Sequence, residues 1–171
     1  RAAQPATLGL VFITDAGANH HTGTTLTVVN GTIRGGNGAL GNPNGATGVD
    51  VAAGQNAPQS VKIIVGKDAK ILGGKGADAA DNSGLRGGNG GVGIQGAITV
   101  EVLTDGIVKG GNGGNGADAD TEAAKPGNGG SGGVGTNVKK VTLQSGAILG
   151  GNGGKGGKAS GGNKNPGGTG G

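Results

Sequence analysis

Two short segments of the sequence match part of a calcium-binding motif. The residues GGKGAD, ending at Asp78, and GGNGAD, ending at Asp118, fit the first six positions of the nonapeptide GGxGxDxUx. The eighth position of that motif is a large apolar residue, but this chain has Ala80 and Asp120 there. The motif binds calcium through tandem copies, whereas these two copies lie 40 residues apart. Asp78 and Asp118 are therefore weak calcium candidates, and calcium binding is the lesser of the alternative functions.

The other residues that could do chemistry form no recognisable catalytic or metal-binding pattern. His20 and His21 are adjacent in a polar stretch, and such a pair without cysteine or a nearby carboxylate is more typical of a solvated loop. The 10 acidic residues include no convergent pair in apolar surroundings that would serve as acid and base. GxGxxG matches arise by chance at this glycine density, and no predicted helix accompanies them. The sequence therefore predicts that the protein is not an enzyme and has no cofactor.

Glycine dominates the composition. Of 171 residues 47 are Gly, whereas Phe12 is the only aromatic residue and there is no Cys. Few large side chains are available for a hydrophobic core, so backbone hydrogen bonds must contribute an unusual share of the stability. The net charge is +4, but basic and acidic residues are interleaved and no aromatic platform exists for base stacking. No stretch approaches the ~18 apolar residues of a membrane span. We therefore expect neither a nucleic-acid partner nor a membrane span.

The chain contains an internal repeat. Four segments align, and in each one alternating apolar residues are followed by a turn, a short apolar pair and a Gly-Gly pair. Spacings of 38, 37 and 40 residues separate the Gly-Gly pairs, which begin at Gly35, Gly73, Gly110 and Gly150. An apolar strand and polar linker over residues 1–25 are predicted to precede a repeat domain over 26–171, with repeats at about 26–60, 61–97, 98–137 and 138–171.

The period of the sequence changes inside each repeat. The first part alternates apolar and polar residues, as a half-buried strand does. The predicted strand core consists of Val61, Ile63, Ile98, Val100, Val102, Val138, Val141 and Leu143. After the Gly-Gly pair the period is three, with glycine at two of every three positions and often Asn, Lys, Asp or Ser at the third. The predicted glycine arms contain Gly35, Gly36, Gly73, Gly74, Gly87, Gly88, Gly110, Gly111, Gly113, Gly114, Gly150, Gly151, Gly153 and Gly154.

A period of three is typical of the extended, left-handed polyproline-type helix, which has no internal hydrogen bonds. Its backbone donors and acceptors must find partners on neighbouring segments, and glycine permits the close approach that this requires. We therefore predict an all-β or irregular fold without α-helix. In this fold short strands accompany polyglycine-II helices, which pack as a bundle or sandwich. The third residue of each triplet is expected to point outward.

The segment from Gly90 to Gly116, GGVGIQGAITVEVLTDGIVKGGNGGNG, resembles the glycine-rich domain of the tip adhesins on T-even-type phage long tail fibres. Similar patterns occur in tail-tip proteins of some other phages, and NGTIRGGNG at residues 30–38 resembles runs in glycine-rich bacterial autotransporter passengers. The resemblance covers most of residues 26–158 and implies a sandwich of packed polyglycine-II helices. In the phage adhesins, loops at the ends of the glycine helices bind the bacterial receptor and tend to carry aromatic residues. The connectors here, residues 77–85 and 117–126, carry none, which favours a shaft, spacer or filament subunit.

These observations predict a non-catalytic structural or adhesive module of an extracellular fibre, either a phage tail fibre or a bacterial surface filament. The expected location is extracellular, at a cell surface or in a virion. Expected partners are further copies of the chain, a neighbouring fibre protein or a cell-surface receptor. The alternative function is ice binding, because a small antifreeze family also uses polyglycine-II bundles. The long and charged residues at third positions, such as Lys155 and Lys158, disfavour the flat, uniform face that ice requires.

The most apolar segment lies outside the four repeats and contains Leu8, Leu10, Val11, Phe12 and Ile13. The simpler interpretation is that this segment caps the first strand layer. The other is an edge strand that pairs with a neighbouring subunit, because open strand edges favour association. These five residues are therefore the candidate subunit contact. Since the chain begins with Arg1 rather than Met, we expect a processed product or a fragment.

Overall fold

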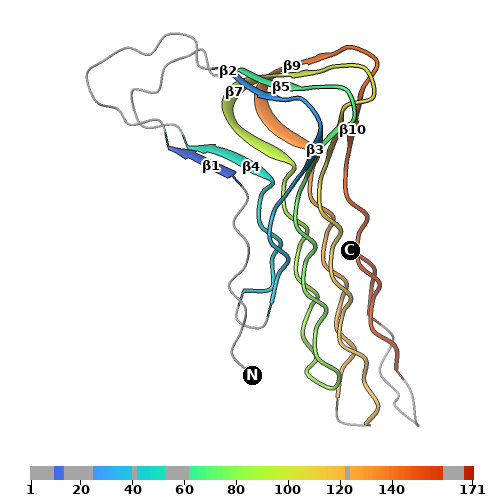
Figure 1. Cartoon of the computed structure of the whole chain (residues 1–171). Coiled ribbons are helices and arrows are strands. Elements are labelled where there is room, and N and C mark those ends of the chain that lie inside the picture. Colours follow the sequence, from blue (N-terminus) through green and yellow to red (C-terminus); the bar gives the residue numbers. More distant parts are fainter. Residues whose placement is uncertain (1–9, 14–24, 40–41, 53–61, 122–123, 160–167) are drawn as a thin grey trace.

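The computed structural model describes residues 10–13, 25–39, 42–52, 62–121, 124–159 and 168–171. These residues contain ten short strands in two parallel sheets and no α-helix, which confirms the predicted all-β class. Nowhere in the described ranges is there a helix with the length and apolar character needed to cross a membrane. The strands gather at one end of the molecule, and the glycine-rich segments run away from them side by side (Figure 1).

The first sheet has β7 (Ile94–Val102) at its centre. The first residues of β7 pair with β4 (Val49–Ala52) and its last residues with β5 (Lys62–Val65). Both parts of β7 also pair with β9 (Thr136–Leu143). Two N-terminal strands extend the sheet, since β1 (Leu10–Ile13) pairs with β4 and β2 (Thr25–Val28) pairs with β5.

The second sheet contains one strand from each repeat. Its order is β10 (Ala147–Leu149), β8 (Ile107–Lys109), β6 (Ala69–Leu72) and β3 (Gly31–Arg34). All three pairings are parallel, and they place equivalent residues of the repeats side by side. One such row contains Ile33, Ile71, Val108 and Ile148.

The chain follows the same path in repeats 1 to 3 (Figure 1). A strand of the first sheet leads through a turn into a strand of the second sheet, and a glycine arm then leaves the sheets, reverses and returns. The returning arm enters β4, the start of β7 or the start of β9. The first sheet thus consists of two sets of strand segments. The return set is β1, β4 and the starts of β7 and β9, and the forward set is β2, β5 and the ends of β7 and β9.

The long strand β7 joins one segment of each set. Its register is irregular between Gly96 and Thr99, where its partner changes from β4 to β5. Gly96 has a φ of 136°, which residues with a Cβ rarely adopt. Glycine is therefore needed at the bend that redirects β7 from one neighbour to the other.

The turns between the two sheets repeat one conformation. Asp68, Asp105 and Ser145 have φ values of 61°, 61° and 59°, the left-handed region that Asp tolerates better than most residues. Each of these residues stands directly before a small residue that begins or precedes the strand of the second sheet. The turn predicted in each repeat is therefore the corner at which the chain passes from one sheet to the other.

The hydrophobic core lies where the sheets face each other. Its buried residues are Val28, Val49, Val51, Ile63, Val65, Ala69, Ile71, Ile94, Ile98, Val100, Val102 and Val108. Of the predicted strand core, Ile63, Ile98, Val100 and Val102 are in this cluster, and Val138 packs against it while partly buried. Val61 lies outside the described residues.

Two predicted core residues are not buried. Val141 and Leu143 are 38% and 52% exposed, although they lie in register with the fully buried Val100 and Val102. They belong to β9, and among the described residues no strand pairs with the other edge of β9. Their side chains therefore continue the core row but have a neighbour on one side only.

Candidate binding surface of the glycine arms

The glycine arms are held by hydrogen bonds to other arms. The first glycine of a triplet donates its N–H to the arm that runs in the same direction in the next repeat. Gly73 donates to the carbonyl of Lys109 at 2.8 Å, and three residues later Gly76 donates to the carbonyl of Asn112 at 2.8 Å. The return arms use the same three-residue step, as in the bond from Gly90 to the carbonyl of Ser131 at 2.9 Å.

The second glycine of a triplet makes a bond between outgoing and returning arms. These bonds join into continuous relays, in which each residue donates to one arm and accepts from another. One relay, with every N···O distance 2.8 Å, runs from Gly151 through Gly133, Gly111, Gly91, Gly74 and Ala46 to Gly36. A second relay, one triplet further from the sheets, runs from Gly171 through Gly154, Gly130, Gly114, Gly88 and Ala77 to Pro43.

The predicted glycines occupy the interior of this network. Eleven of the fourteen are buried, whereas Gly151 is half-buried and Gly150 and Gly153 are exposed on the outgoing arm of repeat 4. A Cβ on Gly111 would lie 1.8 Å from the carbonyl oxygen of Gly74, and one on Gly114 would lie 1.9 Å from that of Ala77. We interpret the arms as polyglycine-II helices, because they combine a three-residue bonding step with this close approach.

The third residue of a triplet completes the network with its side chain. The backbone N–H of a third-position residue, and that of Asp120 in the connector, donates to the Oδ1 of an Asn or Asp in the preceding repeat, 37 to 45 residues earlier, at 2.7 to 3.1 Å. The accepting residues are Asn37, Asn44, Asp78, Asn82, Asn89, Asn112, Asn115, Asp118 and Asn128. In repeats 2 and 3 such a bond gives all three N–H groups of the triplet a partner, as in Gly73, Gly74 and Lys75.

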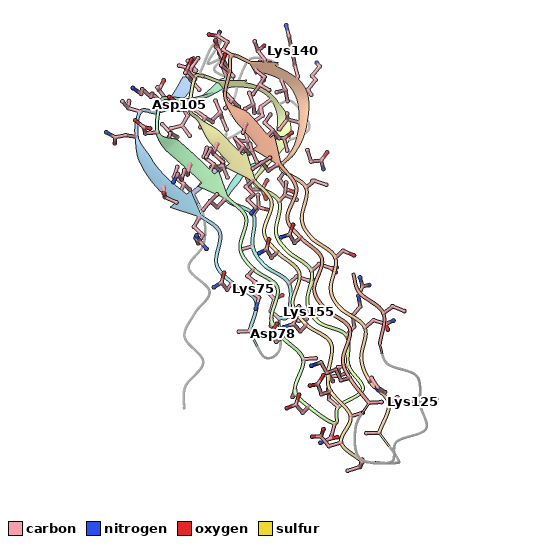
Figure 2. The ribbon with its side chains drawn as sticks, turned by 90° about the vertical axis from the view of Figure 1, so that its right-hand side faces the viewer. Lys75, Asp78, Asp105, Lys125, Lys140 and Lys155 are labelled. Atoms are coloured by element: carbon pink, nitrogen blue, oxygen red, sulfur yellow. The ribbon has the colours of Figure 1, made fainter. Side chains whose placement is uncertain are left out.

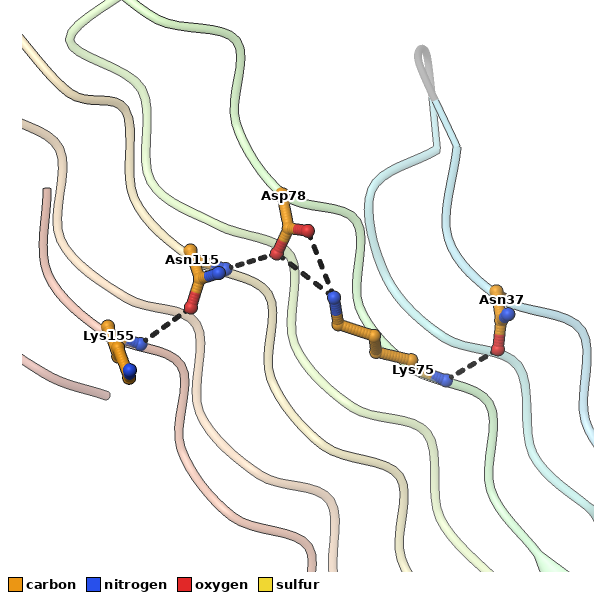
Figure 3. A network of polar contacts seen from close by, with 5 residues as sticks. All are labelled: Asn37, Lys75, Asp78, Asn115 and Lys155. Atoms are coloured by element: carbon orange, nitrogen blue, oxygen red, sulfur yellow. Dashed lines mark hydrogen bonds and ion pairs between the residues drawn. The ribbon is translucent and has the colours of Figure 1, made fainter.

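These bonds from backbone N–H groups to Asn or Asp Oδ1 atoms form a side-chain ladder across the arms. Figure 3 shows one stretch of this ladder, from Asn37 across to Lys155. Asn37 accepts the N–H of Lys75, Asp78 accepts the N–H of Asn115, and Asn115 accepts the N–H of Lys155. The ammonium of Lys75 also contacts both carboxylate oxygens of Asp78, at 3.2 and 3.0 Å. The N–H of Asn115, and after it the ammonium of Lys75, lower the pKa of Asp78 because both stabilise the ionised carboxylate.

The two calcium candidates are members of this ladder. Asp78 bonds to Asn115 and Lys75, and Asp118 accepts the N–H of Lys158 at 2.7 Å. No group of three or more metal-ligating side chains occurs in the described ranges. His20 and His21 fall outside those ranges. Each carboxylate has a structural role that an asparagine performs elsewhere in the same ladder.

Sequence reasoning missed this role of the third residue. The residue does lie at the surface, as predicted, but Asn and Asp there are bonded to the neighbouring arm rather than free. A signal was present in the residue types. Asn and Asp have an acceptor on a short side chain, and Lys155 and Lys158 replace them in repeat 4, whose outgoing arm has no further outgoing arm beside it in the described residues.

We expect Asn112→Ala to lower the free energy of unfolding by about 0.5–1.5 kcal/mol, the usual net value of one hydrogen bond. The N–H of Asn152 would lose its partner, the Oδ1 of Asn112 at 3.1 Å. Asn112→Asp should retain this acceptor and remain close to the parent chain. Lys155→Ala removes a third-position side chain that accepts no bond, and it should change stability little. Urea unfolding measures all three, and equal losses for the two alanine variants would contradict the ladder.

The N-terminal apolar segment pairs within its own chain. Leu10, Val11, Phe12 and Ile13 lie parallel to β4, in register with Val49–Ala52. This placement is the capping arrangement, with β1 at the end of the return set of strands. Leu8 lies outside the described residues. Contact of this segment with another subunit, through the edge of β1 that faces away from β4, stays a prediction.

The comparisons with known proteins give no relative. No protein-family model, curated protein or solved structure matches the chain.

Proposed function

We propose that this chain is a non-catalytic structural or adhesive module of an extracellular fibre. The supporting observation is the pair of hydrogen-bond relays, each of which crosses seven arm segments drawn from all four repeats. Every arm is held by its neighbours through backbone groups at three-residue steps, so bending one arm requires breaking bonds to several others. Such a network suits a stiff shaft or spacer.

The outgoing arms of repeats 2 and 3 extend far from the sheets (Figure 2). Lys125 marks this far end, and Lys140 lies at the opposite end with the sheets. The connectors carry small and polar side chains, with Leu85 as an exposed exception at 63%. This composition supports a spacer more than a receptor-gripping tip, since binding hot spots are enriched in Trp, Tyr and Arg.

The outer face of the first sheet argues against the ice-binding alternative. Lys62 and Glu101 form an ion pair on neighbouring strands, and Lys140 lies exposed one strand further along. Thr25, Thr27, Thr99 and Thr142 share this face with those charges, so threonines do not form a uniform array. A thermal-hysteresis measurement on the purified chain should accordingly show no activity.

Immunogold electron microscopy tests the fibre role. An antibody raised against the purified chain is applied to intact cells and to any virions of the source, and the same sample is labelled after permeabilisation. Label along surface fibres or virion tails without permeabilisation is expected. Label that appears only after permeabilisation would exclude an extracellular fibre.

A further inference from the structure

The two strand ends of the repeat stack are complementary, and among the arms residues 168–171 extend one return arm beyond residues 127–135. The return set, the forward set and the second sheet each contain four strand segments. The forward set and the second sheet have one from each repeat, whereas the return set begins with β1, which precedes repeat 1. One end of the stack therefore presents β1, β2 and β3 together, and the other presents both parts of β9 together with β10. Within the described ranges no strand lies beyond either end.

The repeat 4 end exposes the hydrophobic core in cross-section. Val141 and Leu143 continue the rows of the buried Val100 and Val102, and Leu149 on β10 is 47% exposed. The equivalent positions at the repeat 1 end are Leu26 for Val141 and Val28 for Leu143. A further repeat on β9 would cover these side chains, as β9 itself covers Val100 and Val102.

The polar groups of the two ends also match. Gly35, Gly73 and Gly110 each donate an N–H to the outgoing arm of the next repeat. The equivalent group is the N–H of Gly150, and neither it nor the N–H of Gly153 has an acceptor in the described part of the chain. The repeat 4 end thus offers unpaired donors at a three-residue spacing.

The outgoing arm of repeat 1 offers the corresponding acceptors. The carbonyls of Leu72, Lys109 and Leu149 accept from the preceding repeat, and Arg34 occupies this position in repeat 1. Three residues further, the carbonyl of Asn37 has no described partner. The N–H of Asn37 lacks an Oδ1 acceptor, and the Oδ1 of Asn152 lacks a donor in the described chain.

We propose that the chain binds a second copy of itself head to tail, with repeat 1 of one copy continuing the stack on repeat 4 of the other. In this contact Gly150 donates to the carbonyl of Arg34 of the next copy, and Gly153 donates to the carbonyl of its Asn37. The N–H of that Asn37 donates to Asn152 Oδ1. Because the two surfaces differ, the contact is heterologous and can propagate into a filament. The inference deepens the proposed fibre role and rests on it for its biological meaning.

The lysines of the repeat 4 end do not oppose this register. In the extended stack Lys140 lies beside Thr25 of the next copy, in the row that contains Lys62 and Thr99. Lys155 and Lys158 lie on the second and third triplets of their arm. The described outgoing arm of repeat 1 ends at Ala39, which pairs with Asn42 of the returning chain. In the contact it therefore lies beside the first triplet and Gly153, and does not extend to Lys155 or Lys158. No like-charge pair is brought together at the contacting rows.

A pair of cysteines tests the contact directly, because the chain contains no Cys of its own. Thr27 and Thr142 are exposed on one row of the first sheet, separated by β5 and β7. Three strand spacings of about 4.8 Å place them about 14 Å apart within one copy, too far for a disulfide, which needs Cα atoms within about 7 Å. In the head-to-tail contact they become neighbours on adjacent strands.

We expect the double variant Thr27→Cys with Thr142→Cys to give, after mild oxidation, a ladder of dimers, trimers and longer oligomers on a non-reducing gel. Each single variant should give dimers at most. The matched control is Thr27→Cys with Lys125→Cys, because Lys125 is exposed at the far end of the arms (Figure 2). An equal ladder from the control pair, or none from the test pair, would overturn the head-to-tail contact.

A substitution on the end face supplies the second measurement. Leu143→Lys in the double-cysteine chain places a charge in the contact and should reduce cross-linked oligomers about tenfold or more. Leu85→Lys makes the same change at another exposed leucine and should leave the ladder unchanged. Cross-linking that is unchanged by Leu143→Lys would contradict the proposal. A chain that binds heparin through the lysines of the repeat 4 end, but does not self-associate, would contradict it as well. If immunogold labels the surface but the cysteines do not cross-link, the head-to-tail contact is wrong and the fibre role stands. If the cysteines cross-link but the protein is absent from the surface, the fibre role is wrong and the contact stands.

Discussion

Gly111→Ala is expected to destabilise the chain by more than about 3 kcal/mol, or to prevent folding altogether. The added Cβ would lie 1.8 Å from the carbonyl oxygen of Gly74 and 2.6 Å from its carbonyl carbon. Both atoms belong to backbone, so no side-chain rotation can relieve the overlap. Gly111 also donates to Gly91 and accepts from Gly133, and separating the arms would leave these groups unpaired.

The control for this prediction is Gly150→Ala, in the equivalent arm of repeat 4. The nearest heavy atom to a Cβ there is the carbonyl oxygen of Gly133 at 3.8 Å, an ordinary contact distance. Stability should change by less than about 0.5 kcal/mol, or rise slightly because alanine restricts the unfolded chain. Guanidinium unfolding followed by circular dichroism compares the two variants. Similar midpoints would show that the arms are not packed through glycine.

The sequence was sufficient to predict which residues must be small. A glycine pair every three residues leaves two bare positions per turn of a polyproline-type helix, and those positions meet neighbouring backbone. Gly73, Gly74, Gly110 and Gly111 are all buried against other arms as this argument requires. The alternation of apolar residues likewise located the strands that contain Ile63 and Val100.

The partners of these residues could not be predicted in the same way. Periodicity says that Gly74 faces a neighbour, but not that the neighbours are Gly36, Ala46 and Gly91 from three different arms. Those contacts depend on stacking order, which is a property of whole repeats. The exposure of Val141 and Leu143 was missed for the same reason, because the pattern of β9 does not reveal that it is an edge strand.

The role of asparagine at third positions could not be predicted from the sequence, for a different reason. From the sequence Asn112 is a polar residue on an outward position, which is compatible with solvation alone. Its Oδ1 accepts a bond from Asn152, forty residues later, and the bond exists only because parallel stacking puts the two arms in register. Residue type indicated an acceptor, but the identity of the donor required the structure.

Val100→Ala should lower the free energy of unfolding by about 2–3 kcal/mol. Val100 is fully buried on β7, with Ile63 on one neighbouring strand and Val141 on the other in the same row. Removing two methyl groups loses their transfer free energy of about 0.8 kcal/mol each, and the surrounding strands cannot collapse into the cavity without shifting register. This thin core has few other large side chains to compensate.

Val141→Ala makes the same chemical change one strand away and separates burial from residue type. Val141 is 38% exposed at the edge of β9 that no described strand covers, so water can fill the space that its methyl groups leave. Its loss should stay below about 1 kcal/mol in a monomeric sample. Urea unfolding at low protein concentration measures both variants without a contribution from association. If Val141→Ala were as damaging as Val100→Ala under those conditions, β9 would have to be covered within the monomer, and the open end on which head-to-tail stacking depends would not exist.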